Sequence, residues 1–245
     1  MRVPRLYHPD ELTVGTEITL SADAFQHSVR ALRMASGDAV ILFNGDGFDY
    51  RAQLTEVSKR TAQAQLLEQR ENPSESPVAV HLGQVISRGD RMDFALQKSV
   101  ELGVTEITPL FSERCGVKLA GERLDKKIKQ WQKVVVSACE QSGRSVVPRV
   151  NDACDVARFV EHSDAALRLT LDPCASIPLR QLTDNTAVEH LALIIGPEGG
   201  FTDDEVANAN HFGFKPIRVG PRILRTETAA LTALSVIQYE LGDLA

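Results

Sequence analysis

Two short stretches in the last quarter of the chain combine glycine, proline and charged residues in patterns that could hold a ligand. The first is the turn Gly196–Gly200, which follows the apolar run 191–195 and precedes Thr202 and Glu205. An unbroken apolar run predicts a buried strand of a parallel sheet. A threonine three residues before a glutamate has the spacing of a helix capping box. Because glycine leaves room beside the backbone, this stretch predicts a strand, a ligand-binding turn and a helix from Thr202.

The charges around this turn favour a ligand that is neutral or cationic where it contacts the chain. Glu198 lies inside the turn, and Asp203, Asp204 and Glu205 fill the first turn of the expected helix. These carboxylates occupy the positions at which a helix N-terminus attracts anions, so they would repel a phosphate. The Walker lysine and the G-x-G-x-x-G pattern are missing as well. A tight turn with ordinary capping explains the same residues equally well.

A second turn of this kind follows about one strand–helix unit later and carries arginines. Residues 214–219 predict a strand, and Gly220–Arg225 form a Gly-Pro turn. Residues 226–241 predict a helix that is apolar nearly all round and therefore buried on more than one side. Turns that end strands of an open α/β sheet meet at its carboxyl edge, where such sheets bind ligands. The two turns are therefore expected to share one crevice.

Together the two turns resemble the signature of the SPOUT superfamily of methyltransferases. More narrowly they resemble the RsmE family, which methylates N3 of one uridine in 16S ribosomal RNA. The likeness extends over nearly the whole chain and includes Arg2–Arg5, Gln97–Val104, Ser112–Cys115 and Glu140–Arg144. It implies an α/β fold with a trefoil-knotted SPOUT methyltransferase domain, preceded by a small β-rich PUA-like barrel domain that binds RNA. It also implies S-adenosylmethionine as cofactor, 16S rRNA of the small ribosomal subunit as partner, and a homodimer.

The resemblance also indicates which residues hold the cofactor. Backbone groups of the two turns are expected to hold adenine and ribose, while Leu171, Ile195 and Ile223 pack on the base. An acid-rich, glycine-lined pocket suits the positive sulfonium, and no metal is expected. The expected cofactor-binding residues are Leu171, Ile195, Gly196, Pro197, Glu198, Gly199, Gly200, Val219, Gly220, Ile223 and Leu224.

Methylation of uridine N3 needs help, because this nitrogen carries a proton at neutral pH. Arg225 is the first candidate to stabilise negative charge on a uracil oxygen. Glu227 is a candidate for the base or for orienting Arg225, although ordinary charge at a helix N-terminus explains Glu227 equally well. Since N3 lies on the Watson–Crick edge, the target base must be unpaired or flipped out.

Length and composition favour an ordinary globular protein. The chain has 245 residues, of which 24% are charged, and a net charge of −6. This length allows one large or two modest domains. No apolar run approaches the ~20 residues that span a membrane, and we find no signal peptide. The four cysteines are widely spaced without a C-x-x-C pair, which favours reduced thiols and a cytoplasmic location.

The net charge hides a basic segment that could contact RNA. Residues 112–150 hold nine Lys or Arg against four Asp or Glu, a local net charge of +5, whereas residues 151–212 hold three against eleven, a net of −8. A local patch matters more to RNA than the total charge, although a solvated helix face is the common alternative. The expected RNA-binding residues are Arg2, Arg5, His27, Arg30, Arg33, Arg88, Arg114, Lys118 and Arg144.

The segment 71–77 divides the chain, because its two prolines and small polar residues break regular structure. With this boundary, the resemblance implies a PUA-like RNA-binding domain over residues 1–72 and a SPOUT methyltransferase domain over residues 73–245. Trp131 is expected to anchor a core, with base stacking as the alternative. Further expected strands are 39–43, 48–55, 61–66, 78–86, 105–111 and 167–171, and further expected helices are 22–34, capped by Ser21, 91–103 and 123–139.

Two other functions fit the same residues. A non-catalytic RNA-binding or ribosome assembly factor could keep this fold, and it would take up no cofactor. A SPOUT enzyme could also act on transfer RNA or on 2′-hydroxyls. A phosphate-binding nucleotidase is disfavoured by the acidic turn and the missing lysine.

Overall fold

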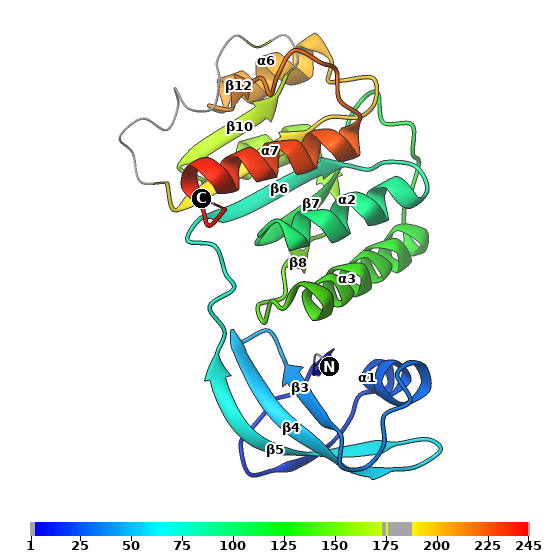
Figure 1. The fold of residues 1–245 in the computed structure, drawn as a ribbon. Coiled ribbons are helices and arrows are strands. Elements are labelled where there is room, and N and C mark those ends of the chain that lie inside the picture. Colours follow the sequence, from blue (N-terminus) through cyan, green and yellow to red (C-terminus); the bar gives the residue numbers. More distant parts are fainter. Residues whose placement is uncertain (1–2, 173–174, 176–187, 245) are drawn as a thin grey trace. The chain divides into compact units, whose positions relative to one another are not determined.

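The chain folds into two units, each with its own sheet (Figure 1). The structure is a computed structural model and describes residues 3–172, 175 and 188–244, so Arg2 and Cys174 lie outside the described residues. Contacts between residues group Met1–Glu75 with Val136–Val147, and Ser76–Val135 with Pro148–Ala245. The division after Glu75 falls close to the boundary expected after residue 72. The return of residues 136–147 to the first unit was not expected.

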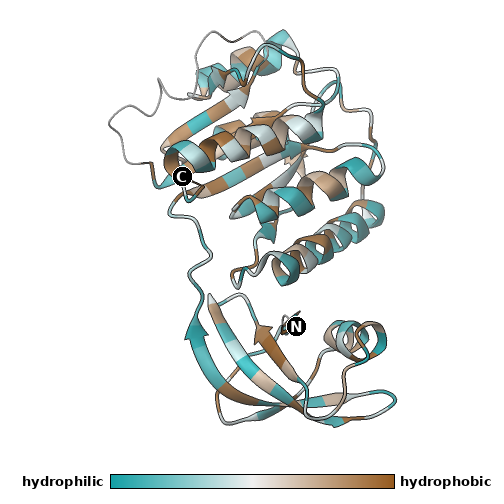
Figure 2. Ribbon diagram, viewed as in Figure 1, coloured by the Kyte–Doolittle hydropathy of each residue, from teal (hydrophilic) through white to brown (hydrophobic). Residues whose placement is uncertain are grey.

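The first unit is built on a five-stranded sheet in the order β1-β3-β4-β5-β2. Strand β1 pairs with β3 in parallel, and the other pairs are antiparallel. The burial of β5 alternates over its first residues, as expected for a strand with one buried face, and Figure 2 shows the contrast between mostly apolar β3 and largely polar β5. The strands are β1 (Arg5–Tyr7), β2 (Glu17–Thr19), β3 (Ala39–Phe43), β4 (Phe48–Val57) and β5 (Ala62–Glu71).

The expected helix over residues 22–34 is shorter and changes form. Ser21 caps α1 (Ala22–Phe25) by accepting a hydrogen bond from the Ala24 N–H. The chain then widens into the π-helix η1 (Gln26–Ala31), in which the Ser28 hydroxyl donates to the Ala24 carbonyl at 2.7 Å. Serine bonds of this kind compete with regular helix geometry. A π turn is a form that the apolar spacing does not predict.

The second unit is organised around a sheet in which every pair of strands is parallel. Its order is β12-β10-β11-β6-β7-β8, and β9 also pairs with β7. Strand β11 confirms the buried apolar run, because residues 191–195 are at most 1% exposed. The strands are β6 (Ala79–Val85), β7 (Glu106–Phe111), β8 (Arg149–Val150), β9 (Cys154–Asp155), β10 (Leu167–Leu171), β11 (His190–Ile195) and β12 (Lys215–Ile217).

The helices expected around these strands begin and end close to the expected positions, whereas the helix over residues 156–162 was not expected. Thr202 and Glu205 form the capping box, so α6 starts at Asp203, one residue after the expected start. Trp131 is fully buried and donates to Asp93 at 3.0 Å, which confirms packing as its role. The helices are α2 (Asp90–Glu101), α3 (Glu122–Ser142), α4 (Val156–His162), α6 (Asp203–His211) and α7 (Thr226–Leu241).

Helix α7 buries one face rather than several. Ala230, Leu234 and Ile237 are fully buried, and the helix packs against α2 and β11. Leu231 and Val236 on the other side are only partly buried, and Tyr239 is 61% exposed. The expectation of burial on more than one side is therefore not met within the described chain.

Candidate functional site

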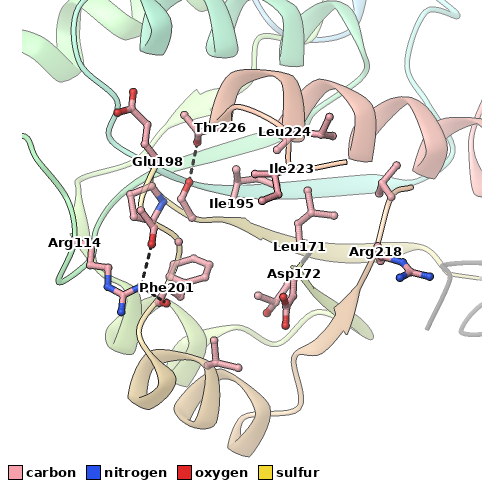
Figure 3. A pocket seen from close by; sticks show the side chains of 18 of the residues that line it. Arg114, Leu171, Asp172, Ile195, Glu198, Phe201, Arg218, Ile223, Leu224 and Thr226 are labelled. Atoms are coloured by element: carbon pink, nitrogen blue, oxygen red, sulfur yellow. Dashed lines mark hydrogen bonds between the residues drawn. The ribbon is translucent and has the colours of Figure 1, made fainter. Parts of the chain in front are cut away.

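The turns at the carboxyl ends of β10, β11 and β12 enclose a cavity of about 580 Å³ (Figure 3). The parallel sheet brings these ends to one edge, as expected for the two Gly-Pro turns. All eleven residues expected to bind the cofactor line this cavity: Leu171, Ile195, Gly196, Pro197, Glu198, Gly199, Gly200, Val219, Gly220, Ile223 and Leu224. Other lining residues that the sequence did not single out include Thr170, Asp172, Phe201, Arg218, Arg222 and Thr226.

The turn after β11 needs glycine at two of its positions. A Cβ at Gly196 would lie 3.2 Å from the ring of Phe201, closer than a side chain normally packs. Gly200 has a φ of 69°, in the left-handed region that favours glycine, and its N–H donates to the Pro197 carbonyl at 2.9 Å. Gly199 is less constrained, because a Cβ there would make only an ordinary 3.5 Å contact with Arg114.

Arg114 also lines the cavity and holds this turn through its backbone carbonyls. Its Nη1 donates to the carbonyls of Gly199 and Phe201, at 2.9 and 3.3 Å (Figure 3). The preceding Glu113 N–H donates to the Glu205 carboxylate at 3.0 Å. Glu113 and Arg114, which follow β7, therefore connect the turn and the first residues of α6 by hydrogen bonds. Arg114 is exposed, and in this structure its guanidinium forms hydrogen bonds with the turn. The sequence predicted a contact with RNA for this residue and not this contact within the chain.

A buried polar relay holds the other end of the turn. The Thr226 hydroxyl donates to the Gly196 carbonyl at 2.8 Å (Figure 3) and accepts from the Gln84 side-chain amide at 3.1 Å. Gln84 is fully buried and Thr226 is 4% exposed. Sequence reasoning missed both residues, because a glutamine within a strand and a threonine at a helix start have common structural explanations.

The Glu198 carboxylate points away from the cavity in Figure 3 and forms an ion pair with Arg91 of α2. Its charge is therefore compensated by a neighbour, which weakens its expected contribution to an acidic pocket. Asp172 and Asp203 are the carboxylates that line the cavity besides Glu198. A cation in the cavity would therefore be attracted mainly by Asp172, which follows β10, and by Asp203, which begins α6.

The apolar residues of the cavity differ in their exposure. Ile195 is 1% exposed and belongs to the cavity floor, whereas Ile223 is 86% exposed and belongs to its rim. Leu171 and Leu224 are partly buried between these extremes. Apolar side chains on two sides of a cavity suit a flat ring such as a nucleobase.

The expected catalytic residues flank Thr226 and do not themselves line the cavity. Arg225 is exposed and is the N-cap residue of α7. Glu227 lies in the first turn of α7, and its Oε2 is buried without a hydrogen-bond partner among the described residues. An unpaired buried carboxylate oxygen is costly, which sets Glu227 apart from an ordinary helix-capping charge.

Two of the arginines expected to bind RNA are buried in ion pairs of the first unit, which corrects that expectation. Arg5 is 8% exposed and donates to Asp49 at 2.6 and 2.9 Å. Burial alone would raise the pKa of Asp49, but hydrogen bonds from Arg5, Ser145 and Asn72 lower it. Arg144 is 3% exposed and donates to both carboxylate oxygens of Glu75, at 2.9 and 2.5 Å. Neither guanidinium is available to a phosphate.

The remaining basic residues are accessible to different extents. His27 and Arg30 lie in the π-helix η1, whereas Arg33 lies beyond its end with a positive φ of 58°, so the three residues do not share one regular helix. His27 lies 3.3 Å from Glu140, and Arg30 donates to the Lys59 carbonyl. Arg88 donates to the Gly116 carbonyl at 3.0 Å. Arg30, Arg33, Arg88 and Lys118 are exposed.

Membrane spans and metal sites concern residues 3–172, 175 and 188–244, the part of the chain that the structure describes. No helix in that part of the chain combines the length and apolar character needed to cross a bilayer. Within the same residues, no three His, Cys, Asp or Glu side chains are placed to share a metal ion.

Comparisons with known proteins agree with this architecture. Residues 74–238 match the model of an RNA methyltransferase domain, and residues 20–67 match that of an RNA methyltransferase PUA domain. Ribosomal RNA small subunit methyltransferase E of Buchnera aphidicola is 35% identical over 243 residues, which cover 99% of this chain and 95% of that protein.

Two solved structures are similar over the whole of both chains. A methyltransferase from Legionella pneumophila in complex with S-adenosylmethionine has a TM-score of 0.95 and 43% identity, with coverage of 100% on each side. Ribosomal RNA small subunit methyltransferase E from Neisseria gonorrhoeae, bound to S-adenosylmethionine, has a TM-score of 0.93 and 38% identity, again with 100% coverage. Together with its parallel-sheet domain and its PUA-like domain, these matches show that the chain belongs to the RsmE family of RNA methyltransferases.

Proposed function

We propose that this protein is an S-adenosylmethionine-dependent methyltransferase that methylates N3 of one uridine in the 16S rRNA of the small ribosomal subunit. The observation that carries the proposal is the cavity at the carboxyl edge of the parallel sheet. All eleven residues expected to bind the cofactor, which lie in the two Gly-Pro turns and at the ends of β10 and β11, line this cavity. Two similar proteins of 38% and 43% identity bind S-adenosylmethionine in their solved structures.

The residues of the cavity fit the chemistry of this cofactor. Backbone groups of residues 196–200 and 219–224 would hold adenine and ribose, with Leu171, Ile195 and Ile223 against the base. The cavity is lined by arginines as well as carboxylates, and among these residues Asp172 and Asp203 are the groups whose charge suits a sulfonium. When bound, the cofactor supplies an activated methyl group, and the chain supplies its position and its surroundings.

Arg225 and Glu227 are the proposed catalytic residues. Arg225 begins α7 and has an exposed side chain, so its guanidinium could stabilise negative charge on a uracil oxygen as N3 loses its proton. Glu227 is the candidate base, and its unpaired buried Oε2 supports a role beyond capping. The target uridine must enter unpaired or flipped out, because N3 is a pairing atom.

The substrate and the assembly follow from the same proposal. Arg30, Arg33, Arg88 and Lys118 are exposed and are the proposed contacts to RNA phosphates. The less buried side of α7, with Leu231, Val236 and Tyr239, is a candidate for the homodimer interface. The trefoil knot stays a prediction, as does the cytoplasmic location that a ribosomal substrate would require.

Substitution of Arg225 tests the catalytic role. Arg225→Ala is expected to lower kcat by about a hundredfold or more, the usual loss when a group that stabilises a transition-state oxyanion is removed. The Kd for S-adenosylmethionine should change little, because Arg225 does not line the cavity. Arg158→Ala is the matched control, since Arg158 is an exposed arginine of α4 outside the site. Equal losses of affinity and turnover would instead make Arg225 a binding residue.

The substrate is tested by mapping methylated nucleotides in RNA from a strain that lacks the gene. The proposal expects one N3-methyluridine to disappear from 16S rRNA and to return with the wild-type gene. Loss of a methyl group from transfer RNA or from a 2′-hydroxyl would reassign the substrate. A purified protein without affinity for S-adenosylmethionine would instead indicate a non-catalytic RNA-binding or ribosome assembly factor.

A further inference from the structure

A chain of two hydrogen bonds crosses the buried interior of the second unit and ends at the cavity wall. Its first member, Gln84, lies in β6 opposite Ile195 of β11 and is fully buried. The Gln84 Nε2 donates to the Thr226 hydroxyl at 3.1 Å, and this hydroxyl donates to the Gly196 carbonyl at 2.8 Å. Buried polar groups are costly unless they are paired. The relay therefore fixes the arrangement of the three elements that it joins.

The Gly196 carbonyl is the point at which the relay can control the turn. The next residue is Pro197, whose nitrogen carries no hydrogen, so the carbonyl is the polar group through which this peptide can be held. At the far end, Arg114 binds the carbonyls of Gly199 and Phe201. The turn that forms one wall of the cavity is thus held at both ends, by a buried hydroxyl and by an exposed guanidinium.

The same relay holds the second wall. Thr226 is the first residue of α7 and follows the loop that contributes residues 218–220 and 222–224 to the cavity. A hydrogen bond between Thr226 and Gly196 therefore joins the two turns to one another. Loss of the Thr226 hydroxyl would leave the Gly196 carbonyl without this donor and the Gln84 amide without this acceptor.

We infer that Gln84 and Thr226 are positioning residues of the cofactor cavity, which set the turn of residues 196–200 against the start of α7. This inference rests on the proposed function. Neither residue is expected to react with the substrate. Their effect is exerted through the backbone of Gly196 and through the placement of Arg225.

Four variants separate this role from general stability. Thr226→Val removes the hydroxyl at nearly constant volume, Thr226→Ser keeps it, and Gln84→Met removes the amide. Thr232→Val is the matched control, because the Thr232 hydroxyl also donates to a carbonyl of α7, that of Thr228, at 2.7 Å but away from the cavity. Calorimetry with S-adenosylmethionine gives Kd, and hydrogen exchange without ligand gives the protection of the Gly200 amide.

We expect Thr226→Val to bind S-adenosylmethionine about tenfold more weakly, the effect of leaving one buried group unpaired. Gln84→Met is expected to weaken binding about threefold or more, because the bond between Thr226 and Gly196 survives in it. Thr226→Ser and Thr232→Val should bind within about twofold of the wild type. Exchange of the Gly200 amide, which donates to Pro197, should be faster in Thr226→Val and unchanged in Thr232→Val.

Wild-type affinity and wild-type Gly200 protection in Thr226→Val would overturn the inference, as would an equal loss in Thr226→Ser. If Thr226→Val does not fold, the result for Gln84→Met decides. If neither folds, the relay serves stability and the inference is wrong. A wild-type protein that binds no S-adenosylmethionine refutes the proposed function, and the exchange of Gly200 then still decides whether the relay orders the turn.

Discussion

Removing the guanidinium of Arg144 should destabilise the first unit without weakening its intrinsic affinity for RNA. Arg144→Met keeps most of the apolar stem and removes the charge. In the wild type both oxygens of Glu75 accept hydrogen bonds from Arg144, whose side chain is 4% exposed. The variant leaves the Glu75 carboxylate without this partner.

The size of the effect follows from the burial of the two side chains. Breaking a buried ion pair from one side usually costs about 3–5 kcal/mol. Water reaches part of Glu75, whose side chain is 25% exposed, so we expect the lower end of that range, about 3 kcal/mol. Glu75→Gln leaves the deeper charge of Arg144 uncompensated and should cost at least as much. The double variant should lose less than the sum of the two, because no unpaired charge remains in it.

Urea unfolding followed by circular dichroism gives the loss of stability from the shift in the transition midpoint. Arg60→Met is the control, since Arg60 is an exposed arginine of the same unit and should change stability by less than about 0.5 kcal/mol. RNA binding is measured where each variant is fully folded. An Arg144→Met protein of wild-type stability that no longer binds RNA would refute the structural role and restore the phosphate contact predicted from the sequence.

Three further predictions concern packing and pH. Gly196→Ala should weaken S-adenosylmethionine binding, because the new Cβ would lie 3.2 Å from the Phe201 ring; calorimetry that gives the wild-type Kd would show that the turn adapts. Gly103→Ala should lower the melting temperature, because Gly103 has a φ of 81° and its Cβ would lie 2.6 Å from the Gln238 amide nitrogen; an unchanged value would contradict this. Burial lowers the pKa of His81 below its ordinary 6.5. As the pH falls, His81 is therefore protonated in the unfolded chain before it is protonated in the folded one, and stability should decline below about pH 6.5. His81→Gln should flatten that decline in urea titrations at several pH values, and an equally steep decline would assign it to other groups.

The parts of the fold that were predicted correctly depend on short-range chemistry. The capping box of Thr202 and Glu205 needs only the spacing of two residues, and the burial of β11 follows from an uninterrupted apolar run. The shared cavity of the two Gly-Pro turns follows from a general rule about the carboxyl edges of parallel strands. Each of these features can be read from neighbouring residues.

The parts that were missed depend on partners far away in the chain. Arg5 pairs with a carboxylate 44 residues away, Arg144 with one 69 residues away, and Gln84 with a hydroxyl 142 residues away. An arginine that will be buried in an ion pair has the same local sequence signal as one that will contact a phosphate. Spacing within a segment cannot distinguish these two outcomes, whereas the fold decides between them.

The first unit includes residues 136–147, which come after α2 and β7 in the chain and contain the last residues of α3. Ser145 in this insert accepts a hydrogen bond from Arg5 and donates one to Asp49, so a fragment that stops at the linker would lack a member of that network. During synthesis the N-terminal sheet therefore has to wait for Val147 to leave the ribosome before its last contacts can form. Genetic exchange that transfers residues 1–75 alone would separate them from Ser145 and its hydrogen bonds, so the PUA-like unit and the methyltransferase unit have to be inherited together.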